Sequence, residues 1–586
     1  MKGAPPALGA AIGVALLAVA GPSGAQEVLP RGALTERVTC RAAPDQSYAL
    51  YLPASYTPER GWPILYVLDA RGRAVDPPRR FERAAASWGW IVASSYGTRS
   101  DAETEPSLRA LRALFADTRE RFSLDERRVY LAGFSGMARL AVTAAANGRG
   151  AIAGVIGVGA GFPDGLPPRR DLSFAWYGAA GARDFNYGEM RDVEARLSAL
   201  SLPHRFRPFD GGHEWPPAQV CGDAVAWMEL QAARRGARPR SDPAFDGLLR
   251  DRTEAASALQ SSGRVLEAFR DWRDLARDFE TLAEVGAADR RARELERSPE
   301  VRRALKEESR LRAAERAEIG RAERVLREAL NQVPLPPAVT VAGDLRVDHW
   351  RREAAAGPSS PRAQMAERVL AKIFVQTAYY LPLRFAQSGE KERAVFVLTL
   401  ATAVRPEEPS AWMGLARAQA RAGRRGAARE AAMTAMERGA TPAEVAADPE
   451  IAPLLQSDAM GRYPMDHSNG FQNLVKDAKS RIRETTPEEV RTRQERGEEF
   501  HLVDVREDGE WARGHIAGAT HLGKGVIERD VEKRIPDNDA EIILYCGGGY
   551  RSALAADALQ KMGYRNVISM DGGWKKWRDL GYPTEE

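Results

Sequence analysis

The sequence contains little cysteine and no strong excess of charge. Only three cysteines occur in 586 residues, namely Cys40, Cys221 and Cys546, which is too few for a disulfide framework. The 85 basic residues nearly balance the 81 acidic ones and leave a formal net charge of +4. This balance does not indicate a nucleic-acid-binding protein. A chain of this length is expected to fold as about two to four domains.

Long hydrophobic runs are also missing, except near the first residues. Residues 8–20 are apolar or small, but this run is too short to span a bilayer comfortably. Lys2 precedes it, and Ser23 and Ala25 stand where a signal peptidase would cut. The pattern predicts a signal peptide over residues 1–25, with an anchoring helix as the alternative. We expect the mature protein to be periplasmic or secreted and to have no membrane attachment.

Residues 26–236 alternate between strand-like and helix-like segments. Helices are predicted at 105–121 and 137–147, and strands at 47–53, 63–70, 89–97, 127–136, 151–161 and 173–181. This alternation predicts a mostly parallel sheet covered on both faces. Cys40 and Cys221 both belong to this domain. They could pair in an oxidising compartment, but their spacing does not show whether they meet.

Ser135 lies in the stretch "VYLAGFSGMARLAV", where a strand turns tightly into a helix. Gly133 and Gly136 flank the serine. Small neighbours are needed there because a nucleophile on so sharp a turn leaves no room for side chains. Met137 stands where the G-x-S-x-G pattern has its second glycine. A match of this length is weak by itself, since ordinary glycine turns also produce it.

Two further residues follow Ser135 in the order that a Ser–Asp–His triad on such a sheet requires. Asp184 comes after one later strand and His213 after the next. Ser135 would attack, His213 would take its proton, and Asp184 would orient the imidazole. The backbone amide of Gly136 would bind the oxyanion, with a second amide near residues 70–71.

The motifs "GFSGMAR", "ARDFNY" and "GGHEWPP" within residues 47–228 resemble the esterase and polyhydroxyalkanoate-depolymerase-like branch of the α/β-hydrolases. The resemblance implies hydrolysis of an ester or a related acyl substrate. Asp210 is a competing acid for the triad. It lies only three residues before His213, which places it poorly to reach the imidazole from a separate strand end.

Residues 241–455 show helical periodicity and no strand pattern. Two segments 34 residues apart carry similar small residues: Gly389, Ala394, Ala401 and Pro406 correspond to Gly423, Ala428, Ala435 and Ala440. This period is the tetratricopeptide signature. The region is either a spacer or a surface that binds a peptide or protein partner. Residues 456–483 are predicted to be a linker, which ends in a helix.

Cys546 follows the apolar stretch "EIILY" and precedes three glycines and a helix. Unhindered amides and the helix start both favour a thiolate, and Arg551 adds a cation. Three roles compete for this thiol: a buried core cysteine, a phosphatase-type nucleophile and a sulfur carrier. Four residues separate Cys546 from Arg551. Cysteine phosphatases have one more, so the tighter loop favours the sulfur carrier.

Residues 484–586 are similar to a rhodanese domain through "LVDVRE", "EWARGHIAGA", "CGGGYRS" and "DGGW". The resemblance implies transfer of sulfane sulfur from a small donor such as thiosulfate to a thiol acceptor. Cys546 would carry the persulfide, and the residues that would surround it are Gly547, Gly548, Gly549, Tyr550, Arg551 and Ser552. Asp504 and Arg506 match motif positions in the supporting strand and are expected to have no direct chemistry.

The sequence therefore predicts an exported multidomain α/β protein with three parts: an α/β-hydrolase sheet, an all-α helical repeat region and a small α/β rhodanese domain. It is expected to be a sulfurtransferase with a second, serine ester hydrolase activity, and to need no cofactor or metal. The alternative is a tetratricopeptide-type scaffold whose other domains act as binding or sensing modules.

Overall fold

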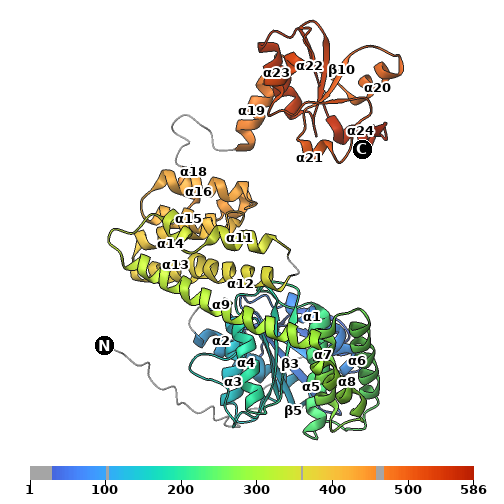
Figure 1. Cartoon of the computed structure of the whole chain (residues 1–586), viewed down its shortest axis with the longest axis vertical. Helices are drawn as coiled ribbons and strands as arrows, with labels where there is room; N and C mark the ends of the chain where they lie inside the picture. The colour runs from blue at the N-terminus through green and yellow to red at the C-terminus, as the bar shows by residue number, and fades with distance from the viewer. Residues whose placement is uncertain (1–28, 101–103, 358–359, 457–466, 586) are drawn as a thin grey trace. The chain divides into compact units, whose positions relative to one another are not determined.

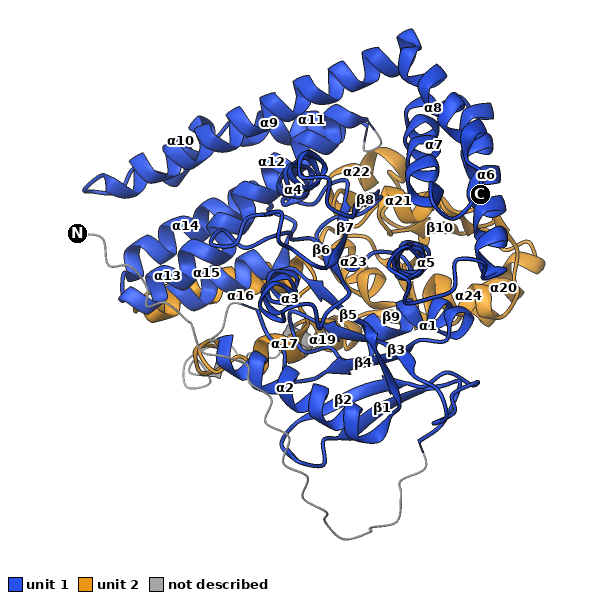
Figure 2. Cartoon of the chain, turned by 90° about the horizontal axis from the view of Figure 1, so that it is seen from below, with its two compact units in different colours: residues 1–418 blue, residues 419–586 orange. Residues whose placement is uncertain are grey.

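The computed structural model describes residues 29–100, 104–357, 360–456 and 467–585. The predicted signal peptide, residues 1–25, lies outside this part of the chain. The chain forms two compact units, residues 1–418 and 419–586, which are drawn in Figures 1 and 2. The division falls inside the predicted helical region. Most of that region therefore belongs to the same unit as the N-terminal sheet.

Within the described residues, eight strands of unit 1 form one sheet in the order β1-β2-β4-β3-β5-β6-β7-β8. β2 runs antiparallel to β1 and β4, and the pairs from β4 to β8 are parallel. The strands are β1 Leu34–Thr39, β2 Ser47–Tyr51, β3 Trp62–Leu68, β4 Ile91–Ser95, β5 Leu124–Phe134, β6 Gly154–Val158, β7 Ala175–Gly181 and β8 His204–Phe209. β1 escaped sequence analysis because only Val38 of it is fully buried.

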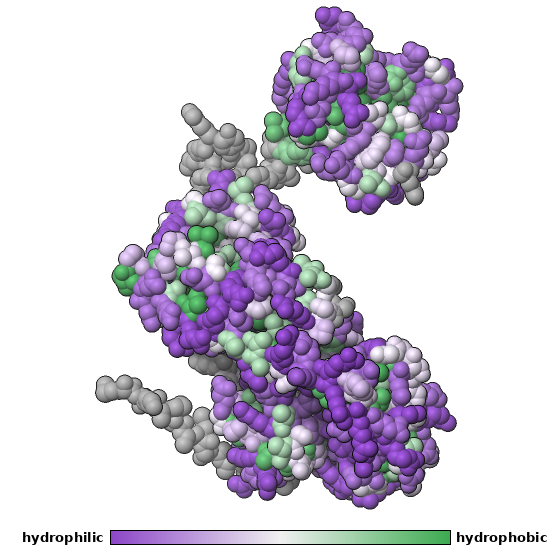
Figure 3. Space-filling model, in the orientation of Figure 1, coloured by the Kyte–Doolittle hydropathy of each residue, from purple (hydrophilic) through white to green (hydrophobic). Residues whose placement is uncertain are grey.

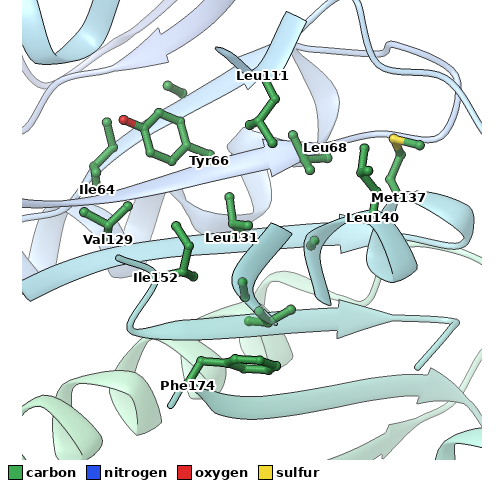
Figure 4. Close-up of a cluster of buried hydrophobic side chains, with 14 of the residues drawn as sticks. Ile64, Tyr66, Leu68, Leu111, Val129, Leu131, Met137, Leu140, Ile152 and Phe174 are labelled. Carbon is green, nitrogen blue, oxygen red and sulfur yellow. The ribbon is translucent and has the colours of Figure 1, made fainter. Parts of the chain in front are cut away.

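Helices cover both faces of this sheet, as the predicted alternation requires. Buried side chains of α2 (Thr104–Arg121), α3 (Gly136–Asn147) and α4 (Tyr187–Ala199) join one core. Those of α1 (Asp76–Trp88) and α5 (Ala218–Arg234) join the core on the other face. Figure 4 shows part of the first core, where side chains from β3 and β5 meet those of α3.

The rest of unit 1 is helical. It contains α6 Ala244–Ser261, α7 Val265–Phe279, α8 Gly286–Arg297, α9 Pro299–Asn331, α10 Ala338–Asp344, α11 Val347–Ala355, α12 Pro361–Val375, the π-helix η1 Gln376–Tyr380, α13 Leu381–Ser388 and α14 Lys391–Val404. α15 (Pro409–Arg421) crosses the boundary between the units, which falls after Ala418. Ser298 caps the start of the long helix α9, and its hydroxyl accepts a hydrogen bond from the amide of Val301. It packs against α7 and α12 (Figure 1).

A buried carboxylate connects helix α7 of unit 1 with two other helices and with the sheet. Asp278 of α7 accepts hydrogen bonds from the indole of Trp227 at 3.1 Å and from Arg252 at 3.1 Å. The same carboxylate also pairs with Arg205 of β8. Asp278 is 1% exposed, so these partners supply the hydrogen bonds that a buried carboxylate needs.

The predicted 34-residue correspondence has a local structural counterpart. Gly389 follows α13 with φ of 75°, and Gly423 follows α15 with φ of 76°. Both are left-handed conformations that favour glycine. Ala401 and Ala435 are both completely buried. Assignment of these helices to the tetratricopeptide family stays a prediction.

Unit 2 begins with α16 Arg425–Glu437, α17 Pro442–Ala446 and α18 Ala452–Gln456. A parallel sheet in the order β12-β10-β13-β14-β9 follows. Its strands are β9 Arg483–Thr485, β10 His501–Asp504, β12 Thr520–His521, β13 Glu541–Tyr545 and β14 Asn566–Met570, while β11 His515–Ile516 pairs with β15 Thr584–Glu585. The helices are α19 His467–Lys479, α20 Pro487–Glu495, α21 Asp508–Trp511, α22 Ile527–Arg534, α23 Tyr550–Lys561 and α24 Gly573–Asp579. α19 lies within the predicted linker, yet it packs against α23.

The surface visible in Figure 3 is mainly hydrophilic, with small separate apolar patches. Among the helices of the described part of the chain, none combines the length and the apolar character needed to cross a membrane.

Candidate active sites

Ser135 sits at the sharp turn between β5 and α3. Its backbone has φ of 57° and ψ of −127°, a conformation that costs energy for any residue other than glycine. The amide of Ser135 donates to the carbonyl of Val158 at 2.8 Å, which ties the turn to β6. At Gly133 an added Cβ would lie 2.3 Å from the carbonyl oxygen of Met137. Glycine is therefore required at position 133, because the backbone of Met137 passes too close to leave room for a side chain.

Met137, which departs from the G-x-S-x-G pattern, fits without distorting this turn. Its side chain is 5% exposed and belongs to the core that also contains Leu68 and Leu140. Figure 4 shows the methionine side chain beside these two leucines. The position can hold a large residue because its side chain points into the core.

The structure brings Ser135, His213 and Asp184 together. The Ser135 hydroxyl oxygen lies 2.9 Å from His213 Nε2, and His213 Nδ1 lies 3.0 Å from both Asp184 carboxylate oxygens. Asp184 is completely buried, whereas the His213 side chain is 22% exposed. The competing acid Asp210 is 86% exposed and pairs with Arg183. The geometry thus selects Asp184 as the partner of the imidazole.

Residues without a predicted role hold this relay in place. The Asn186 amide donates to Asp184 Oδ1 at 2.8 Å, and the Asn186 side chain donates to the carbonyl of Gly159 at 2.8 Å. An added Cβ at Gly159 would lie 3.0 Å from both His213 and Asp184. The Phe185 ring packs on His213 with centroids 4.3 Å apart. Phe185 and Asn186 belong to the motif "ARDFNY", but their contacts with His213 and Gly159 join segments that meet only after folding.

The amides around the predicted oxyanion site are only partly free. The Arg71 amide donates to Asp69 Oδ1 at 2.8 Å, so of residues 70–71 only the Ala70 amide has no hydrogen-bond partner among the described residues. Burial alone would raise the pKa of Asp69, but hydrogen bonds from Arg73 and Trp215 hold it below its usual range. Gly136 begins α3 beside Ser135, where helix amides lack acceptors.

Cys40 and Cys221 do not meet in the structure. Both are buried free thiols, and they belong to the cores on opposite faces of the sheet. Burial raises the pKa of Cys40 to about 11 and that of Cys221 to about 12. These thiols are therefore poor nucleophiles, because the thiolate is the reactive form.

Cys546 is 2% exposed at the end of β13. Its sulfur accepts a hydrogen bond from the Gly549 amide at 3.2 Å. The Ser552 hydroxyl also donates to the sulfur, at 3.7 Å, and itself accepts from Ser569 at 2.9 Å. Both donors point at the sulfur atom. Of the predicted cradle over residues 547–552, the Gly549 amide and the Ser552 hydroxyl contact the sulfur, and roles for the other residues stay predictions.

Close backbone contacts fix the shape of this loop. Gly549 has φ of 95°, and an added Cβ would lie 2.8 Å from Asp571 Oδ1. At Gly573 an added Cβ would lie 2.2 Å from the carbonyl oxygen of Cys546. The Trp574 amide donates to that same carbonyl at 2.7 Å. Residues of the motif "DGGW" therefore pack against the backbone of this loop and fix its shape.

Binding of an anionic donor by Arg551 stays a prediction, and in the structure this arginine pairs with a carboxylate. Its guanidinium donates to both carboxylate oxygens of Glu510, at 2.6 and 2.8 Å. This pairing lowers the pKa of Glu510 to about 2. Tyr550, the other large side chain of the loop, is 51% exposed, so it lies at the surface beside the sulfur site.

Asp504 and Arg506 support the site from the neighbouring strand. Both are buried, and Arg506 donates to Asp504 and to the carbonyl of Gly514 at 2.7 Å. The Arg506 guanidinium also lies 4.6 Å from the centroid of the Trp574 ring. They contact the scaffold around the loop rather than the sulfur.

In the described part of the chain, no group of three or more His, Cys, Asp or Glu side chains is arranged to bind a metal.

The fold and these two sites define a multidomain α/β protein with two separate candidate nucleophiles. The family model for the rhodanese-like domain matches residues 486–580. Thiosulfate sulfurtransferase GlpE of Pseudomonas entomophila is 40% identical over 90 residues, which are 15% of this chain and 80% of that protein. GlpE of Pseudomonas fluorescens is 36% identical over 106 residues, 18% of this chain and 93% of that protein. Through this C-terminal part, the chain belongs to the rhodanese-like family.

The N-terminal unit is similar to a solved structure of another kind. S-formylglutathione hydrolase (FrmB) from Staphylococcus aureus matches 34% of this chain and 99% of its own, with 18% identity and a TM-score of 0.28.

Proposed function

We propose that this protein transfers sulfane sulfur through Cys546 and hydrolyses esters through Ser135. The loop in which the Gly549 amide contacts the Cys546 sulfur at 3.2 Å supports the first activity. The continuous relay from Ser135 through His213 to Asp184 supports the second. The strand order and the positions of this relay at strand ends support an α/β-hydrolase fold for the N-terminal sheet.

Sulfur transfer requires two displacements at one atom. The Cys546 thiolate attacks the outer sulfur of thiosulfate, an S–S bond forms, and sulfite leaves with the electron pair. A thiolate acceptor, or cyanide in the assay, then attacks the outer sulfur and releases the Cys546 thiolate. The Gly549 amide and the Ser552 hydroxyl stabilise the anion at the start and end of this cycle. The loop is small, so a single extra sulfur fits it better than a tetrahedral phosphate.

Ester hydrolysis follows the usual sequence for a serine nucleophile. His213 Nε2 removes the hydroxyl proton while Ser135 Oγ attacks the carbonyl carbon. The resulting imidazolium is stabilised by Asp184 and protonates the leaving alcohol. A water molecule then attacks the acyl-enzyme with His213 again as base, and the acid is released. The amides at Gly136 and Ala70 would bind the oxyanion.

The sulfur-transfer proposal is tested with the full chain and thiosulfate. After removal of excess donor, the peptide that contains Cys546 should gain the mass of one sulfur atom. Cyanide should then remove that sulfur as thiocyanate. Peptides with Cys40 and Cys221 serve as internal controls, because their thiols are buried and have raised pKa values. No added sulfur on Cys546, with no thiocyanate formed, would reject this activity.

The hydrolase proposal is tested with a fluorophosphonate and with nitrophenyl esters. The label should attach to Ser135 and be absent from the Ser135→Ala variant. Ester turnover that does not depend on Ser135 would reject the activity. Failure of both assays would instead favour the scaffold function, in which the helices bind a partner.

Export, proposed from residues 1–25, is tested separately by fractionation of cells that express the full chain.

A further inference from the structure

Two helices from outside the sheet reach the acid loop of the proposed triad. Arg368 of α12 is 5% exposed, and its Nη1 donates to the carbonyl of Ala182 at 2.7 Å. Ala182 directly follows β7 and precedes Asp184 by two residues. The arginine therefore holds the segment that carries the triad acid.

A second buried group fixes the arginine itself. Glu315 of α9 is 3% exposed and accepts hydrogen bonds from Arg368 Nε at 2.9 Å and from Nη2 at 2.6 Å. The Arg368 guanidinium also lies 4.7 Å from the centroid of the Tyr187 ring at the start of α4. The paired, planar guanidinium has one orientation available, and in that orientation it faces the Ala182 carbonyl.

The segment held by Arg368 also connects the two partners of the serine. The Ala182 amide donates to the carbonyl of Phe209 at 2.7 Å, and the Arg183 amide donates to the carbonyl of Gly211 at 2.9 Å. Residues 209–211 lead directly to His213. Arg368 thus fixes the backbone from which both Asp184 and His213 extend. A movement of this backbone would lengthen the contacts of the imidazole.

We propose that Arg368 is a positioning residue for the Ser135 site, and that the helical region of unit 1 therefore completes the hydrolase. This inference rests on the proposed ester hydrolysis. It gives α9 and α12 a role in catalysis, in contrast to a spacer or a partner-binding surface. Loss of the Arg368 contact should lower kcat about 10- to 100-fold, because small displacements of catalytic groups are costly.

The decisive variant is the double replacement Glu315→Leu with Arg368→Met in the full chain. Apolar pairs of similar size often replace a buried ion pair without loss of stability. If Arg368 only stabilised the fold, this apolar pair would restore wild-type behaviour. The hydrogen bond to Ala182 would still be absent. We expect a melting temperature close to that of the wild type, a reduced kcat and a KM within about twofold. The acidic limb of the pH–rate profile should move to lower pH, since a displaced Asp184 stabilises the imidazolium less.

Arg312→Gln is the matched control. Arg312 joins α9 to Asp192 of α4 at 2.7 Å without touching residues 182–184, and Arg316 still pairs with Asp192 in its absence. This control should keep the wild-type kcat and pH profile. A stable double variant with wild-type kcat and pH profile would overturn the proposal.

A second variant covers the case in which the double replacement fails to fold. Arg368→Lys keeps the charge but cannot contact Glu315 twice and Ala182 at once. A reduced kcat with a shifted acidic limb would support the proposal, and unchanged values would overturn it. Failure of the Arg368 proposal can be told apart from failure of the proposed ester hydrolysis. The comparison of the wild type with Ser135→Ala tests ester hydrolysis alone.

Discussion

The two candidate sites surround their reactive side chains in opposite ways. Ser135 depends on His213, 78 residues further along the chain, and on an acid 29 residues before that histidine. Cys546 depends on an amide three residues away and a hydroxyl six residues away. A thiolate can be stabilised by a local loop. A serine needs a base that only the tertiary fold can supply.

The positive φ angle also falls on a different residue in each site. In unit 1 the unusual conformation falls on the nucleophile itself, because Ser135 has φ of 57°. In unit 2 the positive φ angle falls on Gly549, with φ of 95°. Cys546 directly follows the last residue of the regular strand β13. A serine on a strained turn is exposed to its base. A cysteine at a strand end is instead enclosed by the glycines that follow it.

The largest expected effect comes from removing each nucleophile separately. Cys546→Ala should abolish thiocyanate formation and leave ester turnover unchanged, and Ser135→Ala should do the reverse. In a serine hydrolase the loss of the nucleophile lowers kcat by about 10⁶. Both assays on both variants measure this. Loss of both activities in either variant would contradict the independence of the two sites.

The next effect concerns the relay that only unit 1 possesses. Asp184→Asn should keep the shape of the loop but favour the wrong imidazole tautomer, with a fall in kcat of about 10⁴. Ester turnover measures it. Asp210→Asn is the control, since the exposed Asp210 pairs with Arg183 and not with His213. Equal losses in the two variants would argue against Asp184 as the triad acid.

A smaller effect tests the local loop of unit 2. Gly549→Ala should lower sulfur transfer about tenfold or more and destabilise the domain by about 1–3 kcal/mol, because the site needs φ of 95° and has no room for a Cβ. Gly548→Ala is a close control, since an added Cβ there meets nothing within 4 Å. Thiocyanate formation and thermal unfolding measure both. Similar losses at the two glycines would show that loop shape is not the cause.

The smallest effect is a pH dependence at the Arg551–Glu510 pair. The pKa of Glu510 is lowered to about 2 by its hydrogen bonds with Arg551, so its contribution is present above its ordinary pKa and disappears as pH falls toward 2. Glu510→Gln should destabilise the domain by about 1 kcal/mol or less near neutral pH, because solvent screens this partly exposed pair. Hydrogen exchange of α23 amides at several pH values measures it. A difference between wild type and variant that grows on acidification would contradict the pairing.

Part of the fold and of both sites could be read from local patterns. The strands around Ser135, the turn itself and the loop after Cys546 each lie in one continuous stretch. β1 was missed because its outward residues are polar. The pairing of Arg551 with Glu510 was missed because the two residues are 41 positions apart. Likewise, nothing near Arg368 in the sequence indicates that it contacts Ala182, 186 positions earlier.

The sequence by itself determined which residues could react, since it specifies the glycines that each turn needs and the order of serine, acid and base. Tertiary structure decided which acid faces His213, that Cys40 and Cys221 are separated by a sheet, and which helices support the triad. The physical reason is distance along the chain. Backbone conformation depends on neighbouring residues, whereas the hydrogen bonds that orient a catalytic group join segments that only packing brings together.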